Sequence, residues 1–236
     1  MLDTKCRKKV VLPMKYYEIR DPIFGFITIN DWEREIIDHW AFQRLRRIKQ
    51  LAWTDMVYPG ATHNRFEHSL GVMHIATKMF DTIVNKKADF LKSEMNFTDE
   101  GFKRDRVLVR LASLLHDIGH APFSHAGEEV MPLNPATGKP YKHEAYSEAV
   151  IRYFMRDVIE NHPLNQNYHI KADDVADFLA GKPSVQRSLL WRSLISGQLD
   201  ADRADYLLRD SHHIGVEYGK YDLERIKQAF INAFYR

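Results

Sequence analysis

The chain has little cysteine and no long apolar run. Cys6 is the one cysteine among 236 residues, so an intramolecular disulfide is excluded. No run approaches the roughly 18 apolar residues that a membrane-spanning helix requires, and no hydrophobic signal segment opens the sequence. We therefore expect a cytoplasmic protein in a reducing compartment, without a membrane segment.

A strong charge of one sign is also lacking. The sequence has 34 Lys and Arg against 32 Asp and Glu, and the resulting net charge of +2 is too small to indicate nucleic acid by itself. Its 44% hydrophobic and 12% aromatic content is typical of globular proteins. A chain of this length buries roughly 70% or more of its unfolded surface, so a substantial core is available.

The first thirty residues predict a small β-ribbon. Residues 5–12 and 21–29 have the composition of short strands, with a break at Pro13 between them. From Asn30 onward the spacing of apolar residues becomes helical. We therefore predict a β-ribbon extension over residues 1–30 and a helical core domain over residues 31–236.

The rest of the chain predicts a mainly all-α fold. A helix is predicted over residues 32–40 and continues over residues 41–50. Further helices are predicted along a face formed by Val72, Ala76, Met79, Phe80 and Ile83, from Thr98 to the doublet His116-Asp117, and at residues 143–159, 173–180 and 185–194. Loops are predicted at residues 58–64 and 131–142.

A last helix is predicted after the cap Asp222. Its apolar stripe, formed by Leu223, Ile226, Phe230, Ala233 and Phe234, requires a covering surface. The sequence ends inside this helix, at Arg236. We therefore expect a homo-oligomer, or a C-terminal region that this chain lacks.

The doublet His116-Asp117 is the most informative feature, because it places two metal-ligand types where an apolar helix ends. His68 lies upstream, and the acidic segment Asp200-Ala-Asp-Arg-Ala-Asp-Tyr206 lies downstream. Two imidazoles and two carboxylates suit a divalent ion that polarises a phosphoryl oxygen and lowers the pKa of bound water. Taken singly, each residue has an ordinary alternative as a core histidine, a chance dipeptide or a helix cap.

Three segments together resemble the HD-domain phosphohydrolases. They are residues 59–72, 115–125 and 200–210, and the resemblance extends from about Asp21 to about Tyr218. Within that superfamily the chain is similar to the deoxynucleoside triphosphate (dNTP) triphosphohydrolases typified by the sterile-alpha-motif and HD-domain protein. The resemblance implies an HD-domain helical bundle, a divalent ion (Mg, Mn, Fe, Co, Ni or Zn) and a nucleotide substrate, most simply a dNTP.

The resemblance also implies the metal ligands, which are His68, His116, Asp117 and Asp202. Asp202 is preferred because it directly precedes Arg203, and Asp200 remains the alternative. For proton transfer the resemblance implies a histidine cluster with a carboxylate partner, namely His120, His125, His143 and Glu128. His116 and His120 could share one helix face, but Gly119 indicates that the helix ends first, so we expect His120 to face the substrate.

The implied substrate contacts are Gln50, Leu51, Arg65, Arg203, Tyr206 and Asp210. Gln50 and Leu51 would line the sugar, Arg65 would contact a phosphate, and Arg203 with Tyr206 would hold the terminal phosphates. A solvated loop arginine is the ordinary alternative for Arg65, and a half-buried aromatic is the alternative for Tyr206.

Two departures from the family pattern and two competing functions remain. Phe24 stands where a histidine is common, and relatives carry a C-terminal region with further phosphate contacts, so the chain is either a shortened form or a compact member.

The same metal site would also suit a nucleotide phosphomonoesterase or phosphodiesterase. A nucleic-acid-binding or regulatory module with a vestigial site is suggested by the basic residues of 5–9 and 44–49, but no aromatic residues are interleaved with them. Base preference and the need for a nucleotide effector stay open.

Overall fold

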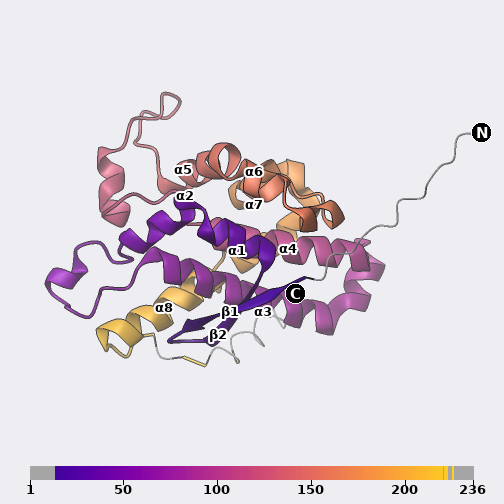
Figure 1. The fold of residues 1–236 in the computed structure, drawn as a ribbon, viewed down its shortest axis with the longest axis horizontal. Coiled ribbons are helices and arrows are strands. Elements are labelled where there is room, and N and C mark those ends of the chain that lie inside the picture. Colours follow the sequence, from indigo (N-terminus) through magenta and orange to yellow (C-terminus); the bar gives the residue numbers. More distant parts are fainter. Residues whose placement is uncertain (1–13, 220, 223–224, 226–236) are drawn as a thin grey trace, which may run out of the picture.

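The computed structural model describes residues 14–219, 221–222 and 225 (Figure 1). The strands and α-helices are β1 Tyr16–Asp21, β2 Gly25–Asn30, α1 Asp31–Asp38, α2 Trp40–Gln43, α3 Arg65–Met95, α4 Asp99–Leu115, α5 His143–Ala149, α6 Arg156–Glu160, α7 Ala172–Ala180 and α8 Ala201–Ile214. The tighter or wider helical segments are η1 Arg44–Arg47, η2 Thr54–Met56, η3 Ser124–Val130, η4 Val150–Phe154, η5 Pro163–Asn167 and η6 Pro183–Leu194. The predicted mainly all-α fold with a small β-ribbon is confirmed.

The β-ribbon is an antiparallel hairpin in which Asp21 pairs with Gly25. The predicted start of the second strand at residue 21 was wrong, since β2 begins at Gly25. Residues 5–12, the first predicted strand, lie outside the described residues, and the start of the second predicted strand forms the turn. The Asp21 carboxylate accepts hydrogen bonds from the backbone N–H groups of Ile23 and Phe24, which bends the chain into this turn.

Helix α1 begins as predicted, but it does not continue through residues 41–50. Asn30 caps α1 in a capping box with Glu33. His39 then adopts an extended conformation, and its ring nitrogen accepts the N–H of Ala41 at 3.3 Å, which starts the short helix α2. The chain continues as the 3₁₀ segment η1. A side-chain cap inside the apolar pattern therefore divides the predicted helix.

Helices α3 and α4 form the centre of the core, packed side by side with α8 against α3 (Figure 1). The five residues of the predicted α3 face are all buried: Val72, Ala76, Met79, Phe80 and Ile83. Asn64 and Glu67 form a capping box at the start of α3, and Thr98 caps α4 as predicted. His116 is the C-cap of α4, so the helix ends at the doublet.

The helices that follow are shorter and less regular than predicted. The predicted helix over residues 143–159 is divided by the π-helical segment η4, where the N–H of Met155 bonds to the carbonyl of Val150. The predicted helix over residues 185–194 is the 3₁₀ segment η6, with non-helical backbone at Val185. Gly181 ends α7 with φ of +70°, and the predicted loop over residues 131–142 is present.

The hairpin packs directly on the helical core. Ile27 and Ile29 of β2 are buried in the same apolar cluster as residues of α3 and α4. The division into a ribbon over residues 1–30 and a core domain over residues 31–236 stays a prediction from the sequence pattern. At the other end, Asp222 accepts the N–H of Arg225, as the predicted cap requires, but the apolar stripe after it lies outside the described residues. Within the described part, no helix combines the length and apolarity needed to cross a membrane.

Candidate functional site

Three helices bring the four predicted metal ligands together. His68 lies in the first turn of α3, His116 and Asp117 follow α4, and Asp202 lies in the first turn of α8. The His68 Nε2 atom is 3.0 Å from Asp202 Oδ1 and 3.7 Å from Asp117 Oδ2, while His116 Nε2 is 3.4 Å from Asp117 Oδ1 and 3.8 Å from Asp202 Oδ1. Bonds of about 2.0–2.2 Å separate the ligand atoms of one ion by about 3–4 Å. His68, His116 and Asp202 therefore present ligand atoms that could hold a single divalent ion, and the Asp117 carboxylate lies beside both histidines.

Both histidines are oriented through their other ring nitrogen. His68 Nδ1 lies 2.7 Å from Asp205 Oδ2, and His116 Nδ1 lies 2.7 Å from the carbonyl of Ser113. These partners are acceptors, so each Nδ1 carries a proton and each Nε2 is the ring nitrogen directed at the carboxylates of Asp117 and Asp202. Both Nε2 atoms are buried, and neither has a hydrogen-bond partner among the described residues. Such buried polar atoms normally have a partner, and a metal ion would supply one here.

The electrostatics of this group also favour a cation. Burial alone would lower the pKa of His68, but its close contacts with Asp202 and Asp205 outweigh burial and raise that pKa to about 10. Burial would raise the pKa of Asp117, yet the nearby His116 and Arg65 hold it well below its ordinary value. The carboxylates therefore stay ionised and create a negative potential that a divalent ion would neutralise.

Asp200 has a different function from its neighbour Asp202. It is the N-cap of α8, and its two carboxylate oxygens accept hydrogen bonds from the backbone N–H groups of Arg203 and Gly197 at 2.7 and 2.8 Å. Asp202, two residues later, faces the histidines instead. The geometry therefore favours Asp202 over Asp200 as a candidate ligand.

Arg65 is not a solvated loop residue. It is the first residue of α3 and is 4% exposed. Its guanidinium donates to the Asp117 carboxylate and to the Ser124 hydroxyl, and its Nε has no partner among the described residues. Arg65 therefore lies against a candidate metal ligand and retains one donor for a further acceptor.

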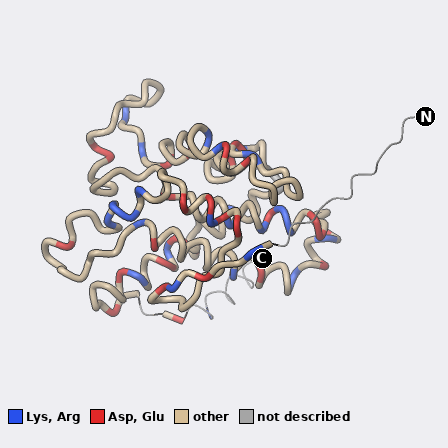
Figure 2. Tube along the Cα trace, viewed as in Figure 1, with Lys and Arg blue, Asp and Glu red and all other residues tan. Residues whose placement is uncertain are grey.

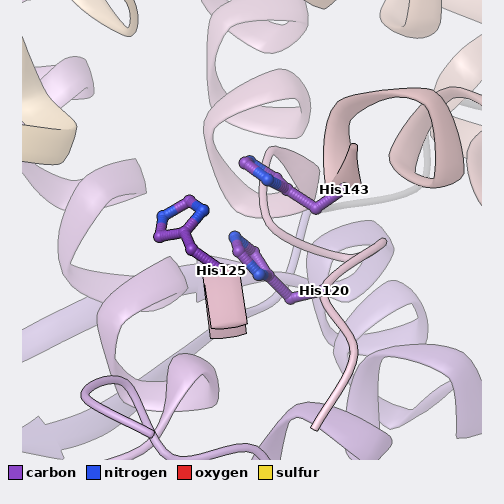
Figure 3. Close-up of side chains that lie close together, drawn as sticks. All are labelled: His120, His125 and His143. Carbon is purple, nitrogen blue, oxygen red and sulfur yellow. The ribbon is translucent and has the colours of Figure 1, made fainter. Parts of the chain in front are cut away.

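The three predicted proton-transfer histidines converge from the segment after α4, from η3 and from α5 (Figure 3). The ring of His120 stacks on that of His143 with centroids 3.7 Å apart, and His125 lies edge-on to both at 5.2 Å. Glu128 Oε1 lies 2.6 Å from His143 Nδ1 and 3.3 Å from His125 Nδ1. One carboxylate oxygen of Glu128 therefore contacts both rings.

His120 connects this cluster to the candidate ligands. Its Nε2 lies 3.4 Å from Asp117 Oδ1, and burial lowers the pKa of His120 to about 4, so the ring is neutral near pH 7. The turn that places it is held by Arg44, which donates to the carbonyls of Ile118 and His120. Ser147 of α5 holds the same turn by accepting the N–H of Gly119.

The six predicted substrate contacts are not gathered in one place. Gln50 and Leu51 lie near Ser124, whose hydroxyl donates to the Gln50 carbonyl, and Gln50 Oε1 is buried without a partner among the described residues. Arg203 is exposed and Tyr206 is half-buried. Asp210 is 4% exposed and bonds to His63 Nε2 at 2.8 Å. The structure gives Asp210 an internal partner, and its predicted contact with the substrate stays a prediction.

A cavity of about 210 Å³ opens beside the candidate ligands. His116, Asp117 and Asp202 line it together with residues of α5, α7 and η6, which include His143, Glu144, Ser147, Glu148 and Arg192. None of the six predicted substrate contacts is among its lining residues. Pockets for whole small molecules usually exceed roughly 300 Å³, so this cavity suits a phosphate-sized group.

Several residues of the site were not found by sequence reasoning. Asp205, which orients His68, lies inside the acidic segment that had been singled out, and its spacing of three from Asp202 was the available signal. Ser124 and Ser147 carried no signal, because serine is common and their contacts connect segments 28 to 74 residues apart. Arg44 had been grouped with basic surface residues.

Comparisons with known proteins agree with this geometry. The model of the HD-domain family matches residues 65–210. Uncharacterized protein YwfO of Bacillus subtilis is 38% identical over 210 residues, which are 88% of this chain and 42% of that protein. Deoxynucleoside triphosphate triphosphohydrolase SAMHD1 of Xenopus laevis is 32% identical over 233 residues, covering 87% of this chain and 35% of that protein.

A solved structure shows the same fold. The crystal structure of a hypothetical protein from Aquifex aeolicus has a TM-score of 0.70 and 33% identity, and the match covers 90% of this chain and 51% of that one. The chain thus spans about half or less of the length of these relatives. The matched residues include all four candidate ligands and the histidine cluster. The chain therefore belongs to the HD-domain family of metal-dependent phosphohydrolases, close to the dNTP triphosphohydrolases.

Proposed function

We propose that the protein hydrolyses deoxynucleoside triphosphates to deoxynucleoside and tripolyphosphate, with His68, His116, Asp117 and Asp202 holding one divalent ion. The observation that carries the proposal is the convergence of His68, His116 and Asp202, with the Asp117 carboxylate beside them and with no hydrogen-bond partner for either buried histidine Nε2 among the described residues. The substrate class is supported by relatives named as dNTP triphosphohydrolases at 32–33% identity. The metal identity stays open.

The bound ion would polarise a phosphoryl oxygen and lower the pKa of a coordinated water. In the proposed reaction, water oxygen bonds to the α-phosphorus, and the bond from that phosphorus to the sugar 5′ oxygen breaks. Arg65 contributes in two ways. It holds Asp117 through one terminal nitrogen, and its free Nε is a donor for a phosphate oxygen.

The leaving 5′ oxygen requires a proton, and the histidine cluster is the proposed source. The Glu128 carboxylate accepts from Nδ1 of His143, which fixes the ring and leaves Nε2 directed away from Glu128. His125 shares the same carboxylate, and its side chain is 70% exposed, so it can exchange protons with solvent. His120 lies between this cluster and Asp117.

We place the nucleoside outside the cavity of about 210 Å³, which is smaller than the pockets of roughly 300 Å³ or more that usually hold whole small molecules. We place the sugar near Gln50 and Leu51, where the unpartnered Gln50 Oε1 is an acceptor for a 3′ hydroxyl. Arg203 and Tyr206 on α8, one and four residues after the ligand Asp202, are the proposed contacts of the terminal phosphates, with Asp210 on the same helix face.

Product analysis tests the proposal. The purified protein is assayed against the four dNTPs, the matching NTPs, a nucleoside monophosphate and an aryl phosphodiester, with Mg, Mn, Fe, Co, Ni or Zn. We expect tripolyphosphate and deoxynucleoside in equal amounts from dNTPs. Orthophosphate from the monophosphate, or cleavage of the diester alone, would instead identify a phosphomonoesterase or a phosphodiesterase.

Three of the basic residues that suggested the nucleic-acid alternative have partners within the described part of the chain. Arg44 bonds to backbone carbonyls, Arg46 lies over the ring of Phe66 at 3.5 Å, and Lys49 pairs with Asp55 at 2.5 Å. Along the described trace, basic and acidic residues are interspersed (Figure 2). The expected homo-oligomer stays a prediction, because the apolar stripe on which it was based lies outside the described residues. The nucleotide effector also stays a prediction.

A further inference from the structure

A row of buried charged groups connects the β-hairpin turn to the metal site. It runs from Asp21 in the turn through Arg209 and Asp205 of α8 to His68 of α3. We propose that Asp21 and Arg209 are positioning residues that hold Asp205, and through it His68, in the orientation that binds the metal ion. The inference rests on the proposed ligand set, of which His68 is a member.

The link between Arg209 and Asp205 is bidentate and fully enclosed. Arg209 Nε lies 2.9 Å from Asp205 Oδ2 and Nη2 lies 2.8 Å from Oδ1, with both side chains 0% exposed. The parallel pair of hydrogen bonds fixes the plane of the carboxylate. Asp205 Oδ2 also accepts from His68 Nδ1 at 2.7 Å. The orientation of the His68 ring therefore depends on where Arg209 holds this carboxylate.

Asp21 fixes Arg209 from the opposite side. Arg209 Nη1 lies 3.0 Å from Asp21 Oδ2 and 3.3 Å from Glu67 Oε2. Asp21 Oδ1 is already engaged by the turn N–H groups of Ile23 and Phe24, and Glu67 Oε1 caps α3. Each carboxylate thus has one oxygen bound to backbone and one directed at the guanidinium. The hairpin turn and the first turn of α3 together set the position of Arg209.

The charge balance gives Asp21 a second effect. One buried guanidinium faces three carboxylates, those of Asp21, Glu67 and Asp205. If the Asp21 charge is removed, the guanidinium is shared by fewer anions and interacts more strongly with Asp205. Asp205 then becomes a weaker acceptor for His68 Nδ1–H, so His68 Nε2 becomes a weaker metal ligand.

Gly71 of α3 shows independently how closely the Asp205 and Arg209 side chains pack against that helix. It lies in the interior of α3, where glycine is unfavourable relative to alanine. A Cβ added at Gly71 would lie 1.8 Å from Asp205 Oδ1 and 2.5 Å from Arg209 Nη2. An alanine here would favour the helix and displace the pair. Gly71→Ala should therefore displace Asp205 and Arg209 without lowering the helix propensity of α3. A loss of metal affinity in this variant would then come from the displaced side chains.

Metal affinity is the direct test, with Mn²⁺ as the probe and the electron paramagnetic resonance signal of free Mn²⁺ as the readout. Asp21→Asn keeps an oxygen for the turn N–H groups and removes the charge that faces Arg209. The matched control is Asp105→Asn, because Asp105 is a carboxylate of similar burial (4% against 3%) that bonds to Ser188 and Trp191 away from the site. Thermal unfolding followed by circular dichroism gives the stability of each variant.

We expect Asp21→Asn and Gly71→Ala to weaken Mn²⁺ binding ~10–100-fold, while Asp105→Asn retains the affinity of the unaltered chain. Unchanged affinity in both folded variants would overturn the inference, as would an equal loss in the control. If Asp21→Asn does not fold, the affinity of Gly71→Ala decides. Absence of Mn²⁺ binding by the unaltered chain would instead contradict the proposed ligand set, so the two failures are distinguishable.

Discussion

Replacing Asp117 with alanine should destabilise the metal-free protein as well as remove a metal ligand. Asp117 and Arg65 are each 4% exposed, and the Arg65 guanidinium donates to the Asp117 carboxylate. In the Asp117→Ala variant this buried cation retains the Ser124 hydroxyl and loses its counter-charge. Breaking a buried ion pair by removing one partner costs about 3–5 kcal/mol.

The size of this effect can be compared with two other variants. An exposed pair, Arg106 with Asp81, has side chains 42% and 36% exposed, so Asp81→Ala should change stability by about 0.2–1 kcal/mol. The double variant Arg65→Met, Asp117→Ala removes the unpaired charge and should recover part of the loss. Proteins of this kind are stable by about 5–15 kcal/mol, so Asp117→Ala should still fold under mild conditions.

Urea unfolding in the presence of a chelator measures these differences, because bound metal would add its own stabilisation. We expect the order of stability to be unaltered chain, Asp81→Ala, the double variant, then Asp117→Ala. A loss of less than about 1 kcal/mol for Asp117→Ala, which is the range of surface pairs, would refute the view that Arg65 and Asp117 form a buried ion pair.

Three further predictions follow from individual contacts. Glu128→Gln should lower turnover by roughly 10²-fold without changing metal content, and an unchanged rate would count against the histidine cluster as the proton source. Ser147→Ala removes the hydrogen bonds to Gly119 N–H and the His116 carbonyl, so urea unfolding should show a loss of about 1–3 kcal/mol; no loss would mean that α5 does not hold this turn. Burial lowers the pKa of His162 from its ordinary 6.5. The unfolded chain therefore binds a proton at His162 more readily than the folded chain does. The contribution of neutral His162 to stability is complete above pH 6.5 and falls as the pH drops below that value. His162→Asn should therefore reduce the loss of unfolding free energy between about pH 8 and about pH 5, and an equal loss in both proteins would contradict this assignment.

Local patterns in the sequence predicted the central helices and most of the candidate metal site. The α3 and α4 faces follow helical spacing, and their starts are set by Asn64 and Thr98, whose side chains bond within three residues. The doublet was visible because His116 and Asp117 interrupt an apolar run. These features depend on contacts that are short along the chain, and a single sequence therefore contains them.

Features that depend on distant contacts could not be predicted. His68 and Asp205 are 137 residues apart in the sequence, and the spacing of three between Asp202 and Asp205 does not by itself identify His68 as the hydrogen-bond partner of Asp205. Arg65 was expected to face a phosphate, and its pairing with Asp117 depends on how α3 packs beside α4. His39 divided a predicted helix because a ring nitrogen caps α2, an arrangement that apolar spacing does not reveal.

The metal content of a double ligand variant tests the central claim most directly. The unaltered chain, His68→Ala with Asp202→Ala, and the control His212→Ala at an exposed position of α8 are each equilibrated with Mn²⁺, dialysed and examined by elemental analysis. We expect one equivalent of metal in the unaltered chain and in the control, and none in the folded double variant. Stoichiometric metal in that double variant would contradict the assignment of the site.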